Sequence, residues 1–200
     1  MVYTDLHYFG CLSYYKTFAV QELVVFDTTA PFSKMSFKNR MVIASAQGPL
    51  HLTIPIVGGR DQKTPMNEIR IAYDSPWKVQ HFKSICTNYK RAPYFEHYVD
   101  SLQLLYQNEY MYLNDFLIAS QHWIKKQLKA SWTIESALVN KAEIKELKWI
   151  DHSKPNNFQT ASQTIQYQQV FDYTTGFIPN CCILDLLFAM GGKQATAMLS

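Results

Sequence analysis

The chain lacks the short motifs that most directly assign a function to a sequence. Its four cysteines show neither a CxxC pair nor a Cys/His spacing suited to zinc, and its six histidines show no metal-ligand spacing. It has no GxGxxG, no P-loop and no Gly-x-Ser-x-Gly elbow, so the sequence gives no support to dinucleotide-binding, P-loop or serine-hydrolase classes. We therefore expect neither a metal nor a cofactor.

Charge and long apolar runs are also scarce. The net charge is only +3 and no basic arm is present, so we expect no nucleic-acid partner. The best apolar run, 181–190, is interrupted by Asp185, so we expect no membrane span. The first residues lack the basic start and apolar core of a secretory signal. Together with the unpaired cysteines, this predicts a cytoplasmic location.

What the chain does contain is typical of one globular domain. Apolar residues make up 48% and aromatic residues 14% of its 200 positions, which is enough for a sizeable core. Tyrosine is the commonest aromatic residue, and its polar tip suits a half-wet cleft as well as a core. We predict a single domain over 1–200, with the polar stretch 140–163 as its least ordered part.

The first thirty residues predict a βαβ unit. A weak strand at 2–9 is followed by helical spacing over 12–21, with Ser13 as a candidate N-cap, and then by the apolar strand 23–27. The second strand would bring Asp27 to the carboxyl-terminal edge of a parallel sheet. In open α/β sheets, ligands usually bind at that edge.

Further strands and then helices follow. Runs 40–46 and 50–57 predict a β-hairpin, and 68–73 predicts a third alternating strand. Gly191 and Gly192 would end the last helix. Helices are predicted from Pro76 to about Arg91 and at 94–107, 111–129 and 179–190, with a strand at 132–139. The fold class is α/β: a mixed, partly parallel sheet flanked by helices, with a β-hairpin insertion and a helical middle region.

A cationic row precedes the hairpin. If the segment is extended, Lys34, Ser36, Lys38 and Arg40 point to one side of the chain, and the residues between them point to the other. Such a row beside strand ends suits a phosphate or carboxylate. The alternative is a solvated edge strand whose lysines block pairing with another strand.

A second acid-free stretch surrounds a histidine. Lys78 and His81 are three residues apart on the predicted helix and so share a face, and no acid occurs between Asp74 and Glu96. A histidine near a helix N-terminus could act as a general acid or base near neutral pH. The alternative is a half-buried histidine that packs on Trp77.

Several of these motifs occur in one order that resembles the WbqC-like family, which has members in bacterial O-antigen gene clusters. The resemblance covers most of the chain and rests on the following residues: Tyr8-Phe9-Gly10 with Tyr14-Tyr15, the strand ending at Asp27, Phe32-Ser33-Lys34 with Asn39-Arg40, Leu52-Thr53-Ile54-Pro55-Ile56, Trp77 with His81, Tyr89-Lys90-Arg91-Ala92-Pro93-Tyr94-Phe95, Phe177-Ile178-Pro179-Asn180, and Ile183-Leu184-Asp185-Leu186-Leu187-Phe188.

The chain departs from longer relatives in two places. Relatives usually open with a Gln-Pro pair ahead of the first helix, and they carry an extra α/β segment where this chain has the polar stretch 140–163. The chain therefore resembles a short form of the family. Whether the short form is catalytic is left open by the sequence.

The resemblance implies a role in surface-polysaccharide biosynthesis, through acyl or aminoacyl transfer onto a nucleotide-linked amino sugar. His81 would transfer a proton and Lys78 would stabilise charge. The residues predicted to bind the sugar nucleotide or another phosphorylated small molecule are Lys34, Ser36, Lys38, Asn39, Arg40, Asp27 and Tyr8. The resemblance supports Lys34, Asn39, Arg40 and His81 in particular, because these are its motif positions. The alternative is a non-catalytic binding or assembly protein of the same family.

Overall fold

The computed structural model describes residues 1–137 and 165–200. Three of its strands form a parallel sheet in the order β1-β2-β5, with β1 at Val2–Asp5, β2 at Leu23–Asp27 and β5 at Thr133–Ala137. Helix α1, at Leu12–Lys16, connects β1 to β2. The predicted βαβ unit is therefore confirmed, although its helix is shorter than the predicted 12–21.

The strand ends place two acids side by side. The register runs from Val2 opposite Val24 to Asp5 opposite Asp27. Every residue of β1 is buried, as expected for a strand covered on both faces. Asp27 thus lies at the carboxyl-terminal edge of the sheet, as predicted, and Asp5 lies beside it.

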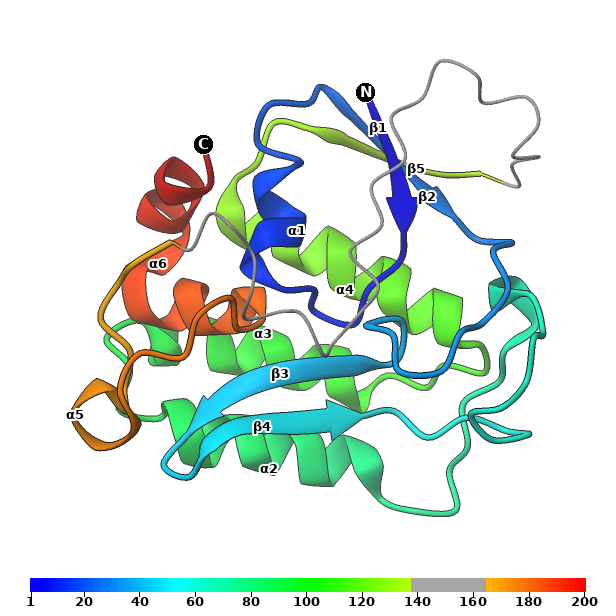
Figure 1. The fold of residues 1–200 in the computed structure, drawn as a ribbon, viewed down its shortest axis with the longest axis horizontal. Helices are drawn as coiled ribbons and strands as arrows, with labels where there is room; N and C mark the ends of the chain where they lie inside the picture. The colour runs from blue at the N-terminus through cyan, green and yellow to red at the C-terminus, as the bar shows by residue number, and fades with distance from the viewer. Residues whose placement is uncertain (138–164) are drawn as a thin grey trace.

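The predicted hairpin is also confirmed, but it forms a sheet of its own. Strands β3, at Arg40–Ser45, and β4, at Gly48–Thr53, pair antiparallel, and Gly48 adopts a φ of 101° in the turn between them. Such a φ favours glycine. Figure 1 shows the hairpin in front of α2 and well separated from the parallel sheet.

The predicted third strand at 68–73 is wrong. This segment begins in a short 3-10 helix, η1 at Met66–Glu68, and then makes only isolated bridges. The Arg70 carbonyl accepts from the Val57 N–H at 2.9 Å, and the Ile71 N–H donates to the Met111 carbonyl at 3.0 Å. The segment is extended, but it is held between two loops and has no strand beside it.

The middle of the chain is helical, as predicted. The core of the protein is built where α4 packs on α3, α6 and η1, and where β3 contacts α2 and α6. The remaining helices are α2 at Trp77–Tyr89, α3 at Phe95–Gln107, α4 at Leu113–Leu128, α5 at Asp172–Thr175 and α6 at Ile183–Leu199.

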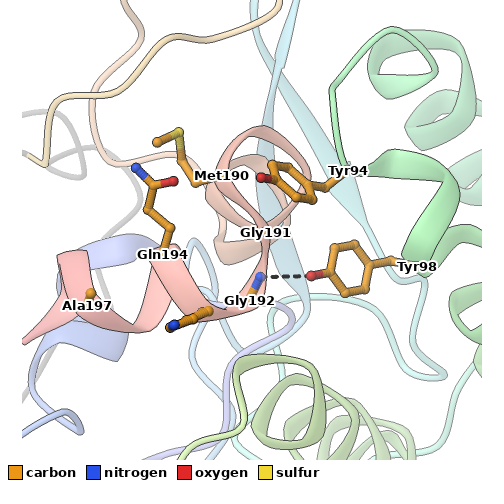
Figure 2. A pocket seen from close by; sticks show the side chains of 8 residues that line it. Tyr94, Tyr98, Met190, Gly191, Gly192, Gln194 and Ala197 are labelled. Carbon is orange, nitrogen blue, oxygen red and sulfur yellow. Dashed lines mark hydrogen bonds between the residues drawn. The ribbon is translucent and has the colours of Figure 1, made fainter.

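Helix α6 kinks at the glycine pair, where an end was predicted. Gly191 has a φ of 73° and a ψ of 159°, and the helix resumes after it and runs to Leu199. A side chain at Gly191 would place its Cβ 2.9 Å from the ring of Tyr94. Figure 2 shows Tyr94 and Tyr98 beside this kink, where the Gly192 N–H donates to the Tyr98 hydroxyl at 2.7 Å.

The segment ahead of α6 is bonded to distant parts of the chain. The Asn180 side-chain oxygen accepts from the Ser13 N–H at 2.7 Å, and the Cys182 N–H donates to the Val42 carbonyl at 2.8 Å. Asn180, which is distant from α1 in the sequence, therefore supplies the hydrogen-bond acceptor for an N-terminal N–H of that helix. The predicted N-cap role of Ser13 is wrong, because Ser13 lies inside the helix and Cys11 precedes it.

All four cysteines are free thiols, as the sequence predicted. Within residues 1–137 and 165–200, no helix is long and apolar enough to cross a membrane. The predicted polar stretch 140–163 lies outside the residues that the structure describes.

Candidate functional site

The predicted one-sided cationic row is wrong. Residues 32–39 form turns, and Met35 adopts a φ of 55°, so the side chains do not alternate as they would in a strand. The Ser36 hydroxyl donates to the Ser33 carbonyl at 2.7 Å, which closes one turn. The Lys34 side chain is 64% exposed, whereas that of Lys38 is 3% exposed.

Lys38 instead joins the acids at the edge of the parallel sheet. Its ammonium lies 3.2 Å from the Asp5 carboxylate and donates to the Pro31 carbonyl, also at 3.2 Å. The neighbouring Asp27 accepts from the Thr29 and Ala30 N–H groups at 2.8 and 2.9 Å. We call Asp5, Asp27 and Lys38 the sheet-edge cluster. It brings together Asp27 and Lys38, which were predicted from separate motifs.

A second cluster joins the loop after β1 to two helices. The Tyr8 hydroxyl lies 2.9 Å from Nδ1 of His81 and also hydrogen-bonds to the Tyr106 hydroxyl. We call Tyr8, His81 and Tyr106 the tyrosine–histidine cluster. His81 is only 6% exposed, and its ring meets Trp77 edge-on at 5.3 Å between centroids.

The surroundings of His81 keep it neutral. Burial lowers its pKa from 6.5 to about 4, and a hydrogen bond to the Thr53 backbone offsets part of that effect. At pH 7 the imidazole is thus unprotonated. In that state Nδ1 can accept a hydrogen bond from the Tyr8 hydroxyl, whose own pKa is raised by burial.

This pKa predicts acid sensitivity. Between about pH 6.5 and pH 4 the unfolded chain binds a proton at His81 that the folded chain does not, so stability is lost as the pH falls. Denaturant unfolding of wild type should show about 3 kcal/mol of this loss between pH 7 and pH 4. His81→Gln should lose that much less over the same interval, whereas His122→Gln, at an exposed position, should behave like wild type. Equal losses in wild type and His81→Gln would contradict the assignment.

Asn39 and Arg40 are held by the hairpin. The buried Asn39 amide donates to the Ile54 carbonyl at 2.8 Å, and the Arg40 guanidinium donates to the Thr53 hydroxyl at 3.3 Å. Lys34 pairs with Asp61 at 2.9 Å on the surface. The predicted binding residues are therefore divided between a buried group and an exposed group.

Lys78 faces a different space from His81. It lines a cavity of about 640 Å³ beside α2, which we call the α2 cavity, together with Arg70, Tyr73 and Tyr110. Its ammonium donates to the Asn108 carbonyl at 3.0 Å and lies 5.5 Å from the centre of the Tyr73 ring. Trp77 contacts Tyr73 on one side and His81 on the other. One aromatic layer thus lies between the α2 cavity and the tyrosine–histidine cluster.

No sequence pattern pointed to Tyr106 or Asp5 as site residues. Tyr106 is 98 residues from Tyr8 and reads as one more apolar position of a helix, while Asp5 reads as the middle of a weak strand. A smaller cavity of about 370 Å³ lies at the α6 kink (Figure 2), and Lys193 is its charged residue. None of the predicted site residues lines it.

The fold and the two clusters define an α/β protein with a polar sheet edge and a buried histidine. The model of the WbqC-like protein family matches residues 7–154. Because the match covers most of the chain, the protein belongs to this family. The motif at 177–188 lies beyond the matched residues. No match was found among curated proteins or among solved structures.

Proposed function

We propose that this protein acts in the biosynthesis of bacterial surface polysaccharide, by transferring an acyl or aminoacyl group to a nucleotide-linked amino sugar. Membership of the WbqC-like family supports the proposal, because the family model matches residues 7–154 and the resemblance described above is to a family with members in bacterial O-antigen gene clusters. The nucleotide-linked sugar would be the partner, and no resident cofactor is required.

The chemistry assigns a task to each predicted residue. In acyl transfer to an amine, the amine nitrogen bonds to the acyl carbon, the bond from that carbon to the leaving group of the acyl donor breaks, and a base takes the proton that the nitrogen releases. His81, which is unprotonated at pH 7, would be that base. Lys78 would stabilise negative charge from the α2 cavity, and Lys34 and Arg40 would meet the phosphates. The internal bonds of Ser36, Lys38 and Asn39 would hold the loop that carries these cations, and Asp27 would orient the segment after β2.

The burial of His81 favours a second candidate. With 6% of its surface exposed, His81 lines neither the α2 cavity nor the cavity at the α6 kink. A general base must come within hydrogen-bond reach of its substrate. A protein of the same family that binds a nucleotide sugar and performs no transfer would need no such access.

One paired experiment separates the two candidates. Wild type and His81→Gln are titrated calorimetrically with nucleotide-linked amino sugars, and each is then incubated with acyl and aminoacyl donors while product is followed by mass spectrometry. The transferase proposal predicts equal binding by both proteins and a rate of transfer at least about 100-fold lower in His81→Gln.

The other outcomes are equally informative. Binding by wild type without any transfer would establish the second candidate. A folded wild-type protein that binds no sugar nucleotide would contradict both candidates.

A further inference from the structure

A large cleft lies at the far end of α2, away from the predicted residues. It is bounded by the hairpin turn at Ala46, the end of α2 and the segment 168–174, and its volume is about 780 Å³. Figure 1 shows α5 and the turn of the hairpin at the same side of the molecule. We call this space the α2–α5 cleft. Its volume lies within the range of about 300 to 1,000 Å³ that small-molecule sites occupy.

Two adjacent cations and no acid line the α2–α5 cleft. Lys90 and Arg91 follow the last turn of α2, and both are exposed. In residues 1–137 and 165–200, the ion pairs are Lys34–Asp61 and Lys38–Asp5, so neither of these cations is paired there. A cavity lined by two free cations attracts an anionic ligand.

The two cations could simply offset the partial negative charge at the end of α2. In its strongest form, that role would include hydrogen bonds from their side chains to the last carbonyls of the helix. Instead, the backbone N–H of Lys90 occupies the Cys86 carbonyl at 3.0 Å, and within the described ranges neither side chain bonds to a helix carbonyl. Both side chains therefore remain available to bind an anion in the cleft.

The nearby acids, Asp172 and Asp185, do not line the cleft. Asp172 accepts from the Gln169 N–H at 2.8 Å and is not among the residues that line the space. Asp185 is 2% exposed and lies behind Gln169, whose side chain donates to it at 2.7 Å. The cleft therefore presents a positive face without a competing carboxylate.

The wall behind the cations is fixed by a buried hydrogen-bond network. Asp185 accepts from Tyr89 at 2.6 Å and from Tyr167 at 2.5 Å, and Gln169 also exchanges bonds with the Ile178 backbone at 2.8 and 2.9 Å. Tyr89 immediately precedes Lys90. The network thus holds two parts of the cleft in fixed positions: Tyr89, just before the two cations, and Gln169, on the opposite wall. A preformed site of this kind loses less conformational entropy when a ligand binds.

The rim offers a surface for a flat ring. Tyr173 is 92% exposed, an unusual state for a tyrosine, and Phe171 lies beside it in the cleft wall. Aromatic side chains stack on nucleobases whatever the base. Gln168 and Thr174 add neutral hydrogen-bonding groups at the same wall.

We propose that the α2–α5 cleft binds a phosphorylated small molecule that carries a flat ring, which is the chemistry of a nucleotide. Lys90 and Arg91 would hold the phosphates, and Tyr173 would stack on the base. The proposal rests on the cleft alone and does not require acyl transfer. The two proposals place phosphates at different positions: the transferase proposal places them at Lys34 and Arg40, and the cleft proposal places those of a nucleotide at Lys90 and Arg91.

The test is calorimetric titration of the full chain with three kinds of probe: nucleoside diphosphates, the corresponding nucleosides and inorganic pyrophosphate. Nucleoside diphosphates should bind, and Lys90→Ala and Arg91→Ala should each raise their Kd about tenfold or more. Lys83→Ala, an exposed cation on the same helix outside the cleft, should leave the Kd unchanged. Tyr173→Ala should weaken the diphosphates and leave pyrophosphate unaffected.

Three results would overturn the proposal: no binding of any probe to the folded wild type, equal Kd values for Lys90→Ala and wild type, or an effect of Lys83→Ala as large as that of Arg91→Ala. The substituted side chains are exposed, so thermal unfolding should confirm that each variant is folded. Because the readout is binding, its failure is distinct from a failure to observe acyl transfer.

Discussion

Replacing Lys38 by methionine should lower the free energy of unfolding by about 3 to 5 kcal/mol. Methionine keeps much of the length and packing of the side chain but removes its charge. The Asp5 carboxylate, 3.2 Å from the ammonium and 12% exposed, would then be a buried charge without its partner cation. Denaturant unfolding at neutral pH measures this loss directly.

The matched control is Lys34→Met in the same loop. Lys34 pairs with Asp61 at 2.9 Å, but both side chains are largely exposed, so its loss should cost less than about 1 kcal/mol. Adding Asp5→Asn to Lys38→Met should cost less than the sum of the two single changes, because both act on one ion pair. Equal losses in Lys38→Met and Lys34→Met would contradict the buried ion pair.

Replacing Gly192 by alanine should cost about 3 kcal/mol or more, or prevent folding. In an ordinary helix position alanine is better than glycine by about 0.5 to 1 kcal/mol, so the expected sign here is reversed. The reason is the approach of α4: a Cβ at Gly192 would lie 2.0 Å from the Gln127 carbonyl oxygen. A backbone oxygen cannot move aside as a side chain can.

Gly59→Ala separates this steric effect from a general sensitivity to glycine replacement. Gly59 also has a positive φ, of 73°, but nothing lies within 4 Å of a Cβ built there. Its replacement should cost about 1 to 2 kcal/mol, from backbone strain alone. If Gly192→Ala is no more costly than Gly59→Ala, the close approach of α4 and α6 is wrong.

The parts of the fold that local patterns determine were predictable. The apolar run at 23–27, the two β-rich runs of the hairpin and the helix start near Pro76 each act over a few residues, and β2, the hairpin and α2 form within a few residues of the predicted positions. Helix α2 begins at Trp77, with Pro76 in the N-cap position in place of Ser75. The βαβ connection followed from the same runs. Family membership followed from the order of the motifs along the chain.

The parts that failed depend on partners far away in the sequence. In the sequence, Lys38 looks like a surface cation in a run of three. It is buried because the fold places Asp5 beside it and the two form an ion pair. Gly191 and Gly192 look like a helix end, yet Tyr94 and α4 provide the packing that lets the helix resume beyond them. No local sequence pattern predicts such contacts, because each depends on how elements far apart in the sequence pack together.

Some residues of the candidate site could likewise be predicted from the sequence, and others could not. Tyr8 and His81 were named from different motifs, and the fold places them in contact. Their common partner Tyr106 had no signal in the sequence. Lys90 and Arg91 belong to a family motif at 89–95, but the cleft that gives them a proposed role is formed by α2, the hairpin turn and the segment before α6.

The measurement that most directly tests where this protein binds its ligand is a crystal structure of the full chain with a nucleoside diphosphate. The cleft proposal predicts phosphate density within hydrogen-bond distance of Lys90 and Arg91, with the base against Tyr173. Density for the phosphates at Lys34 and Arg40, with the α2–α5 cleft empty, would contradict it and return the binding site to the loop before the hairpin.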